Sequence, residues 1–190
     1  MDTYHVVLYI HLMALFVGIG AGAVLLVSLI KLRAAETLAD ALPWGMLAGQ
    51  VEKAFPIAVL GLFGSGAYMT SDVWTWSTGW IAASIVGLGV LAVQGPLVGG
   101  RAGHKLKLAL QANGPGPLSP ATRRSARHPA LWMTECTNLA LVFGIVWNMT
   151  QKPGTGTAIA TLVIAYAVGG AVAYPFTRLE AEPKTAAETA

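Results

Sequence analysis

The sequence predicts an all-α membrane protein, a polytopic bundle of five transmembrane helices. Of its 190 residues, 55% are hydrophobic and 11% are charged, and the mean hydropathy is +0.60. A water-soluble domain carries about 25% charged residues, so this chain has too few charges to cover a surface in water. Its apolar stretches do not alternate polar with apolar residues, which favours helices over a membrane β-barrel.

The charges and the cysteine content also exclude classes of function. The net charge is +3, and so few charges in so apolar a chain exclude nucleic-acid binding as the main role. Cys136 is the only cysteine. The chain therefore has no internal disulfide and no zinc site built from cysteine pairs.

Five stretches are long enough to cross a hydrocarbon core of about 30 Å, which takes about 20 helical residues. They cover residues 5–30, 55–70, 79–100, 130–150 and 157–176. The connection 32–53 is expected to form one or two short helices on the cytoplasmic face, with a break at Pro43. After the third span, HKLKLALQ predicts an amphipathic extension that NGPGPLSP must interrupt.

The basic residues predict the orientation of the chain in a bacterial cytoplasmic membrane. Eleven of the twelve Lys and Arg residues follow the first, third or fifth span, and only Lys152 lies on the other side. The positive-inside rule therefore places the amino terminus outside the cytoplasm and the carboxyl terminus inside. We expect the chain to consist of a four-span bundle (1–153), a fifth transmembrane helix (154–176) and a polar cytoplasmic tail (177–190). Trp74, Trp76, Trp80 and Trp147 lie on the outer side and are typical of an interfacial belt.

Small residues at intervals of four predict where the helices pack closely. They are Gly18 and Gly22 in the first span, Gly95, Gly99 and Gly103 at the end of the third, and Thr157, Thr161, Ala165, Gly169 and Ala173 in the fifth. The GxGxG at 18–22 is not a dinucleotide-binding loop, because it lies inside an apolar helix. The fifth-span stripe is expected to attach to another helix, in this chain or in a neighbour.

His11 is the candidate ligand for a metal or cofactor. It precedes Gly18 and Gly22 by seven and eleven residues, so a period of 3.6 turns it inward, in the outer third of the bilayer. A histidine there suits axial ligation of haem b or copper, with Met69 or Met149 as second ligand. The alternative is a hydrogen-bonded histidine at a helix interface, with the methionines as ordinary packing.

Glu135 is the unusual polar residue of the fourth span. A carboxylate near a helix centre costs about 2.5 to 3.5 kcal/mol on the insertion scale, so it needs a partner or a proton. We expect a polar contact among Gln94, Glu135 and Asn138. This cluster is either a proton or quinone-headgroup site, or a set of interhelical hydrogen bonds worth about 0.6 to 2 kcal/mol each.

Four segments also carry a family resemblance, which covers residues 1–153. They are YIHLMALFVGIGAG, AFPIAVLGLFGSGAYM, GPLVGGRAG and VFGIVWNMTQKP, in this order. Together they resemble an uncharacterised bacterial family of small integral membrane proteins with an inward first-span histidine and a terminal Met-x-x-Lys-Pro. That family is similar in pattern to the membrane part of copper-resistance D proteins and to the haem-dependent J-type protoporphyrinogen oxidase.

The resemblance implies that His11 corresponds to the haem-ligating histidine of the oxidase-like relatives. Glu135 and Lys152-Pro153 resemble the end of that enzyme's last conserved helix. The chain departs from the oxidase after Trp80, where Ile-Ala-Ala-Ser replaces a stretch with an essential lysine. A fifth span is a further departure from the four-span unit of the family.

Two functions follow from these features. The first is a non-catalytic accessory or assembly subunit of a larger membrane complex concerned with electron transfer or photosynthesis, which needs only the spans and the glycine stripes. The second is a small membrane redox or metal-handling protein that holds haem b or copper through His11. The expected partners are lipids and other membrane subunits, or a second copy of the chain. No catalytic residue is assigned, so the sequence favours a protein that is not an enzyme.

Overall fold

A computed structural model describes residues 2–177, and within them every named element is a helix. These are α1 (Thr3–Ala34), α2 (Leu38–Val51), α3 (Ala54–Val73), α4 (Gly79–Gln94), the π-helix η1 (Gly95–Gly100), α5 (Arg101–Ala112), α6 (Pro120–Ala126), α7 (Pro129–Gln151) and α8 (Thr155–Thr177). Apart from Thr177, which ends α8, the predicted polar tail lies outside the described residues.

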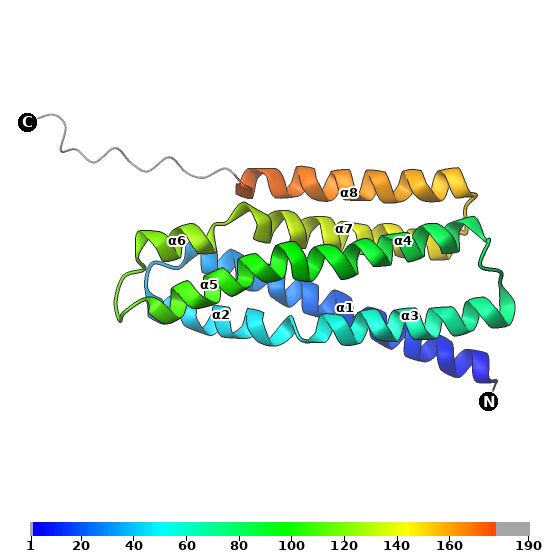
Figure 1. The fold of residues 1–190 in the computed structure, drawn as a ribbon, viewed down its shortest axis with the longest axis horizontal. Coiled ribbons are helices and arrows are strands. Elements are labelled where there is room, and N and C mark those ends of the chain that lie inside the picture. Colours follow the sequence, from blue (N-terminus) through cyan, green and yellow to red (C-terminus); the bar gives the residue numbers. More distant parts are fainter. Residues whose placement is uncertain (1, 178–190) are drawn as a thin grey trace, which may run out of the picture.

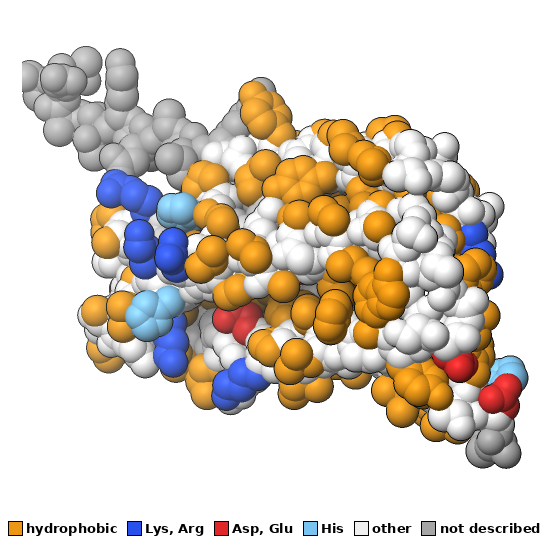
Figure 2. Space-filling view, turned by 45° about the vertical axis from the view of Figure 1, so that its right-hand side comes forward, with side chains coloured by type: hydrophobic (Ala, Val, Ile, Leu, Met, Phe, Trp, Pro, Cys, Tyr) orange, Lys and Arg blue, Asp and Glu red, His pale blue; other side chains and the backbone are white. Residues whose placement is uncertain are grey.

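The prediction of five helices long and apolar enough to cross a membrane is confirmed, which indicates a multi-pass membrane protein. The five run side by side, and the start of α1 and the end of α8 lie at opposite ends of the bundle (Figure 1). The 32 residues of α1 span about 48 Å at 1.5 Å per residue, longer than a hydrocarbon core of about 30 Å. The bundle therefore extends beyond the hydrocarbon, and Figure 2 shows Lys and Arg side chains gathered at one of its ends.

Small residues bring α1 and α3 together. A Cβ on Gly61 would lie 2.9 Å from the Cβ of Ala14, and one on Gly18 would lie 3.4 Å from that of Ala58. Without a hydrophobic force between helices in lipid, such close approach supplies the packing energy. The next inward position along this antiparallel interface pairs His11 with Ser65.

The fifth span packs along α7 of the same chain. A Cβ on Gly169 would lie 2.6 Å from the carbonyl oxygen of Cys136, and one on Gly144 would lie 2.9 Å from the Cβ of Ala165. Ala173 is fully buried, as expected for the stripe, whereas Thr157 is exposed. Near the start of α8, the residue that contacts α7 is Ala158, whose carbonyl accepts a hydrogen bond from Asn148 Nδ2 at 3.0 Å.

The third span continues as the predicted helical extension, although its centre is irregular. The extension is α5, and the loop after Ala112 ends it. Between α4 and α5, six residues adopt the π-helix η1, with Pro96 at its start. Proline has no N–H to donate to the carbonyl four residues earlier, which explains a local widening of the helix.

The connection 32–53 contains one short helix, as predicted, but without the predicted break and in a different position. It forms one helix, α2, which runs roughly in line with α3 and alongside α1 (Figure 1). Pro43 lies inside α2 without ending it. Ala41 of α2 is buried in a cluster with Leu32 and Trp132, and this burial holds the helix against the bundle instead of on a lipid surface.

Candidate functional site

A cavity of about 440 Å³ lies between α1, α3, α4 and α7, at the end of the bundle that holds the amino terminus. Its wall is mostly apolar, and its volume falls within the range of about 300 to 1,000 Å³ typical of small-molecule sites. The three candidate ligands, His11, Met69 and Met149, all line it. The structure therefore brings together residues from three helices that are separated by up to 138 positions in the sequence.

The hydrogen bonds around His11 define which ring nitrogen is free. Nδ1 lies 2.9 Å from Ser65 Oγ, and the Ser65 hydroxyl donates to the carbonyl of Gly61 at 2.5 Å. A hydroxyl has one proton to donate, so in the contact between the two side chains Nδ1–H donates to Ser65 Oγ. A neutral imidazole with its proton on Nδ1 keeps a lone pair on Nε2. Besides Ser65, the backbone of Leu62 also forms a hydrogen bond with the His11 ring.

Helix α3 provides the wall opposite His11. Gly66 leaves room for the imidazole, because a Cβ at that position would lie 3.4 Å from His11 Cε1. Ser65 was not identified from the sequence. The spacing of Gly61, Ser65 and Met69 could have indicated it, because residues at intervals of four lie on one face of a helix.

Aromatic side chains and one cation form the mouth of the cavity. Trp74 and Trp80 meet edge to face with ring centroids 5.4 Å apart, and Lys152 Nζ lies 4.7 Å from the centroid of Trp74. Lys152 ends α7 in the left-handed conformation, with φ of 50°. It is the only Lys, Arg, Asp or Glu among the described residues that line this cavity. An apolar ligand with an acidic end therefore matches the site.

The expected polar cluster forms around Gln94 without Glu135. Gln94 Nε2 donates to Thr137 Oγ1 at 2.7 Å and to Asn138 Oδ1 at 3.3 Å. The hydroxyl of Tyr166 on α8 donates to Gln94 Oε1 at 2.6 Å. Glu135 points elsewhere, toward Gly22 of α1. The residues that complete the network, Thr137 and Tyr166, were not identified from the sequence.

The predicted glycine stripe at the end of the third span faces two helices. Gly95 lies near Asn138, and a Cβ on Gly99 would lie 2.9 Å from Thr134 Cγ2. Gly103 lies against Glu52, at the end of α2. These glycines let α7 and the junction of α2 and α3 approach the backbone of η1 and α5 closely.

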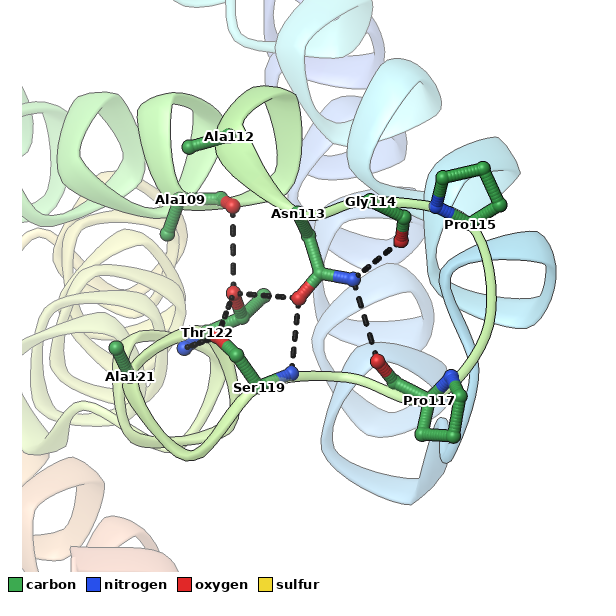
Figure 3. Close-up of a pocket in the computed structure, with 9 residues that line it drawn as sticks. All are labelled: Ala109, Ala112, Asn113, Gly114, Pro115, Pro117, Ser119, Ala121 and Thr122. Atoms are coloured by element: carbon green, nitrogen blue, oxygen red, sulfur yellow. Dashed lines mark hydrogen bonds between the residues drawn. The ribbon is translucent and has the colours of Figure 1, made fainter.

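A second, shallower pocket of about 310 Å³ lies in the loop between α5 and α6 (Figure 3). Asn113 occupies its centre: Oδ1 accepts from the Ser119 N–H at 2.8 Å, and Nδ2 donates to the Gly114 carbonyl at 2.8 Å. Its polar groups thus hold the loop together. Within residues 2–177, no three His, Cys, Asp or Glu side chains lie close enough together to hold a metal ion.

Comparison with known proteins finds no matching family, no matching curated protein and no matching solved structure. The resemblance to the copper-resistance and oxidase-like proteins therefore stays a prediction.

Proposed function

We propose that this protein is a small membrane redox protein that binds haem b in the cavity, with His11 Nε2 as the iron ligand. The observation that carries the proposal is the pairing of His11 Nδ1 with Ser65. Histidines that ligate a metal usually donate their other ring N–H to a fixed acceptor, which sets the tautomer and the orientation of the ring. Ser65 is such an acceptor, because its own proton is donated to Gly61.

The rest of the cavity suits the same cofactor. Apolar walls match the macrocycle, and the acidic propionates of haem match Lys152 at the mouth. Met69 and Met149 offer thioether sulfurs for the second axial position. Bound there, haem would supply one-electron transfer, while the chain orients it and excludes water. Copper uses similar donors, but a cavity of about 440 Å³ is far larger than a single ion needs.

The visible spectrum tests this proposal. We expect the protein, purified after expression with haem or reconstituted with it, to show a Soret band that is lost in His11→Ala. His5→Ala is the matched control, since His5 lies on the same helix but is exposed and pairs with Asp2. A reconstituted protein without a Soret band, or a His11→Ala variant that keeps it, contradicts haem ligation by His11.

Ser65→Ala tests the role of the serine. Loss of the acceptor frees the imidazole to rotate, and replacing such a supporting partner typically weakens metal binding by about 10- to 100-fold. We expect that loss in a haem titration, with the helical content unchanged. Ser28→Ala is the control, because Ser28 also donates to the carbonyl four residues earlier but does not line the cavity. Equal haem affinities in the two variants would show that Ser65 does not position His11.

We propose that the protein lies in a bacterial cytoplasmic membrane with its amino terminus outside the cytoplasm. The end of the bundle rich in Lys and Arg supports this orientation (Figure 2). In it the cavity lies near the outer face, and partners there would exchange electrons with the cofactor. A protein that binds no haem and migrates only with other membrane subunits would instead favour the non-catalytic accessory or assembly role.

A further inference from the structure

Two carboxylates from different helices lie against glycines in the interior of the bundle, away from the haem cavity. Glu135 of α7 is 5% exposed, and its Oε1 lies 3.2 Å from the position of a Cβ on Gly22. Glu52, at the end of α2, has its Oε1 3.1 Å from the position of a Cβ on Gly103. In each case the missing side chain of the glycine makes room for a carboxylate.

The helix formed by η1 and α5 brings these two groups near each other. Gly99 and Gly103 are four residues apart on one face, about 5 to 6 Å along the helix. Gly99 contacts Thr134, the neighbour of Glu135 in α7, and Gly103 contacts Glu52. The contacts of α7 and of Glu52 with this helix are therefore about one helical turn apart, and Glu135 follows Thr134 in α7. Two negative charges in the same part of the interior repel each other.

Among the described residues, no ion pair to either carboxylate offsets this repulsion. Neither carboxylate lies within ion-pair distance of a Lys, Arg or His side chain, and Glu135 Oε1 has no hydrogen-bond partner. A buried, unpaired carboxylate is costly. Binding a proton neutralises the carboxylate and removes most of this cost.

Few charged side chains belong to the described elements packed around Glu135. Helices α4, η1 and α8 contain no Lys, Arg, Asp or Glu. In α1, Lys31 and Arg33 lie over the rings of Trp44 and Trp132.

Beside Glu52, Lys53 donates a hydrogen bond to Gln50. The remaining titratable side chains of α5 are Arg101, His104, Lys105 and Lys107, and the residue that α5 presents to Glu52 is Gly103. The next residue in α7, Cys136, is a buried thiol.

We propose that Glu135 and Glu52 form a proton-binding site, in which the pair holds one proton at neutral pH. The proton adds to a carboxylate oxygen and removes one of the two negative charges. Glu52 is only half-buried, so protons reach Glu135 from the end of the bundle where α2 and α5 lie. The residues that line the haem cavity do not include either carboxylate, so this site does not rest on the proposed haem.

Infrared spectroscopy of the full chain in membranes tests the proposal through the carbonyl stretching band of a protonated carboxylic acid. We expect this band at neutral pH in the wild type, its loss in Glu135→Gln, and no change in Glu36→Gln, where the carboxylate is exposed. In Glu52→Gln the repulsion is gone, so the band should titrate at a lower pH.

Two results overturn the proposal: no such band in the wild type at neutral pH, or a band that survives unchanged in Glu135→Gln. An unchanged titration in Glu52→Gln also overturns it, because the second carboxylate would then play no part. That variant keeps the test decisive if Glu135→Gln does not fold. Haem binding is not measured in this experiment, so its outcome is separate from that of the His11 test.

Discussion

Trp132→Ala is expected to lower the free energy of unfolding by about 3 kcal/mol, at the lower end of the range of about 3 to 5 kcal/mol for replacing a buried Phe or Trp by alanine. The indole is 1% exposed. It stacks on Phe176 with ring centroids 4.3 Å apart, and the Arg33 guanidinium lies 6.0 Å from its centroid. Its buried Nε1 has no hydrogen-bond partner, and this cost in the native state explains the lower figure.

Unfolding in mixed micelles, followed by circular dichroism, measures this loss. Trp147→Ala is the matched control, because Trp147 lies on the same helix and is 55% exposed. We expect Trp147→Ala to change the free energy of unfolding by less than about 1 kcal/mol, as is usual for surface sites. Equal losses in the two variants would mean that the cluster around Trp132 does not stabilise the fold.

Gly169→Ala is expected to separate α7 from α8. The new Cβ would lie 2.6 Å from the Cys136 carbonyl oxygen and 2.7 Å from the Thr137 Cα. Both neighbours are backbone atoms of a helix and cannot rotate away, so the helices must move apart. Overpacking of this kind costs about 1 to 3 kcal/mol. The thiol of Cys136, the only cysteine in the chain, is buried beside this contact, so its rate of labelling by a thiol reagent should rise.

Gly170→Ala is the control for this prediction. A Cβ there would lie 3.7 Å from the terminal methyl of Met133, an ordinary van der Waals contact. Alanine is also favoured over glycine within a helix by about 0.5 to 1 kcal/mol, so this variant should be as stable as the wild type or more so. If both variants label Cys136 at the wild-type rate, the close packing of α8 on α7 is wrong.

The cavity that His11 lines illustrates how far helical spacing predicts a site. The distance of His11 from Gly18 and Gly22 predicted an inward histidine, and His11 is buried against α3. The hydrogen bond between His11 and Ser65 could not be predicted from the sequence, because 54 positions separate the two residues. The register of α1 against α3 decides this pairing.

Glu135 illustrates the opposite case. Glu135 and Asn138, three residues apart in the fourth span, were both predicted to contact Gln94. In the structure Thr137 and Asn138 turn toward Gln94, while Glu135 turns toward Gly22. A step of three residues rotates a side chain by about 60° around the helix axis, which is enough to change the neighbouring helix that it meets.

The sequence by itself determined the number and nature of the spans, because apolar length is a local property of each segment. It also determined where the fifth span could pack tightly, since Gly169 and Ala173 have no bulk to prevent it. Only the tertiary structure decided that α2 joins the bundle, that Glu52 lies against Gly103, and that His11 shares a cavity with Met69 and Met149. The physical reason is that spacing fixes the face of one helix, whereas close contacts between glycines and facing side chains fix the rotation and register of its neighbours.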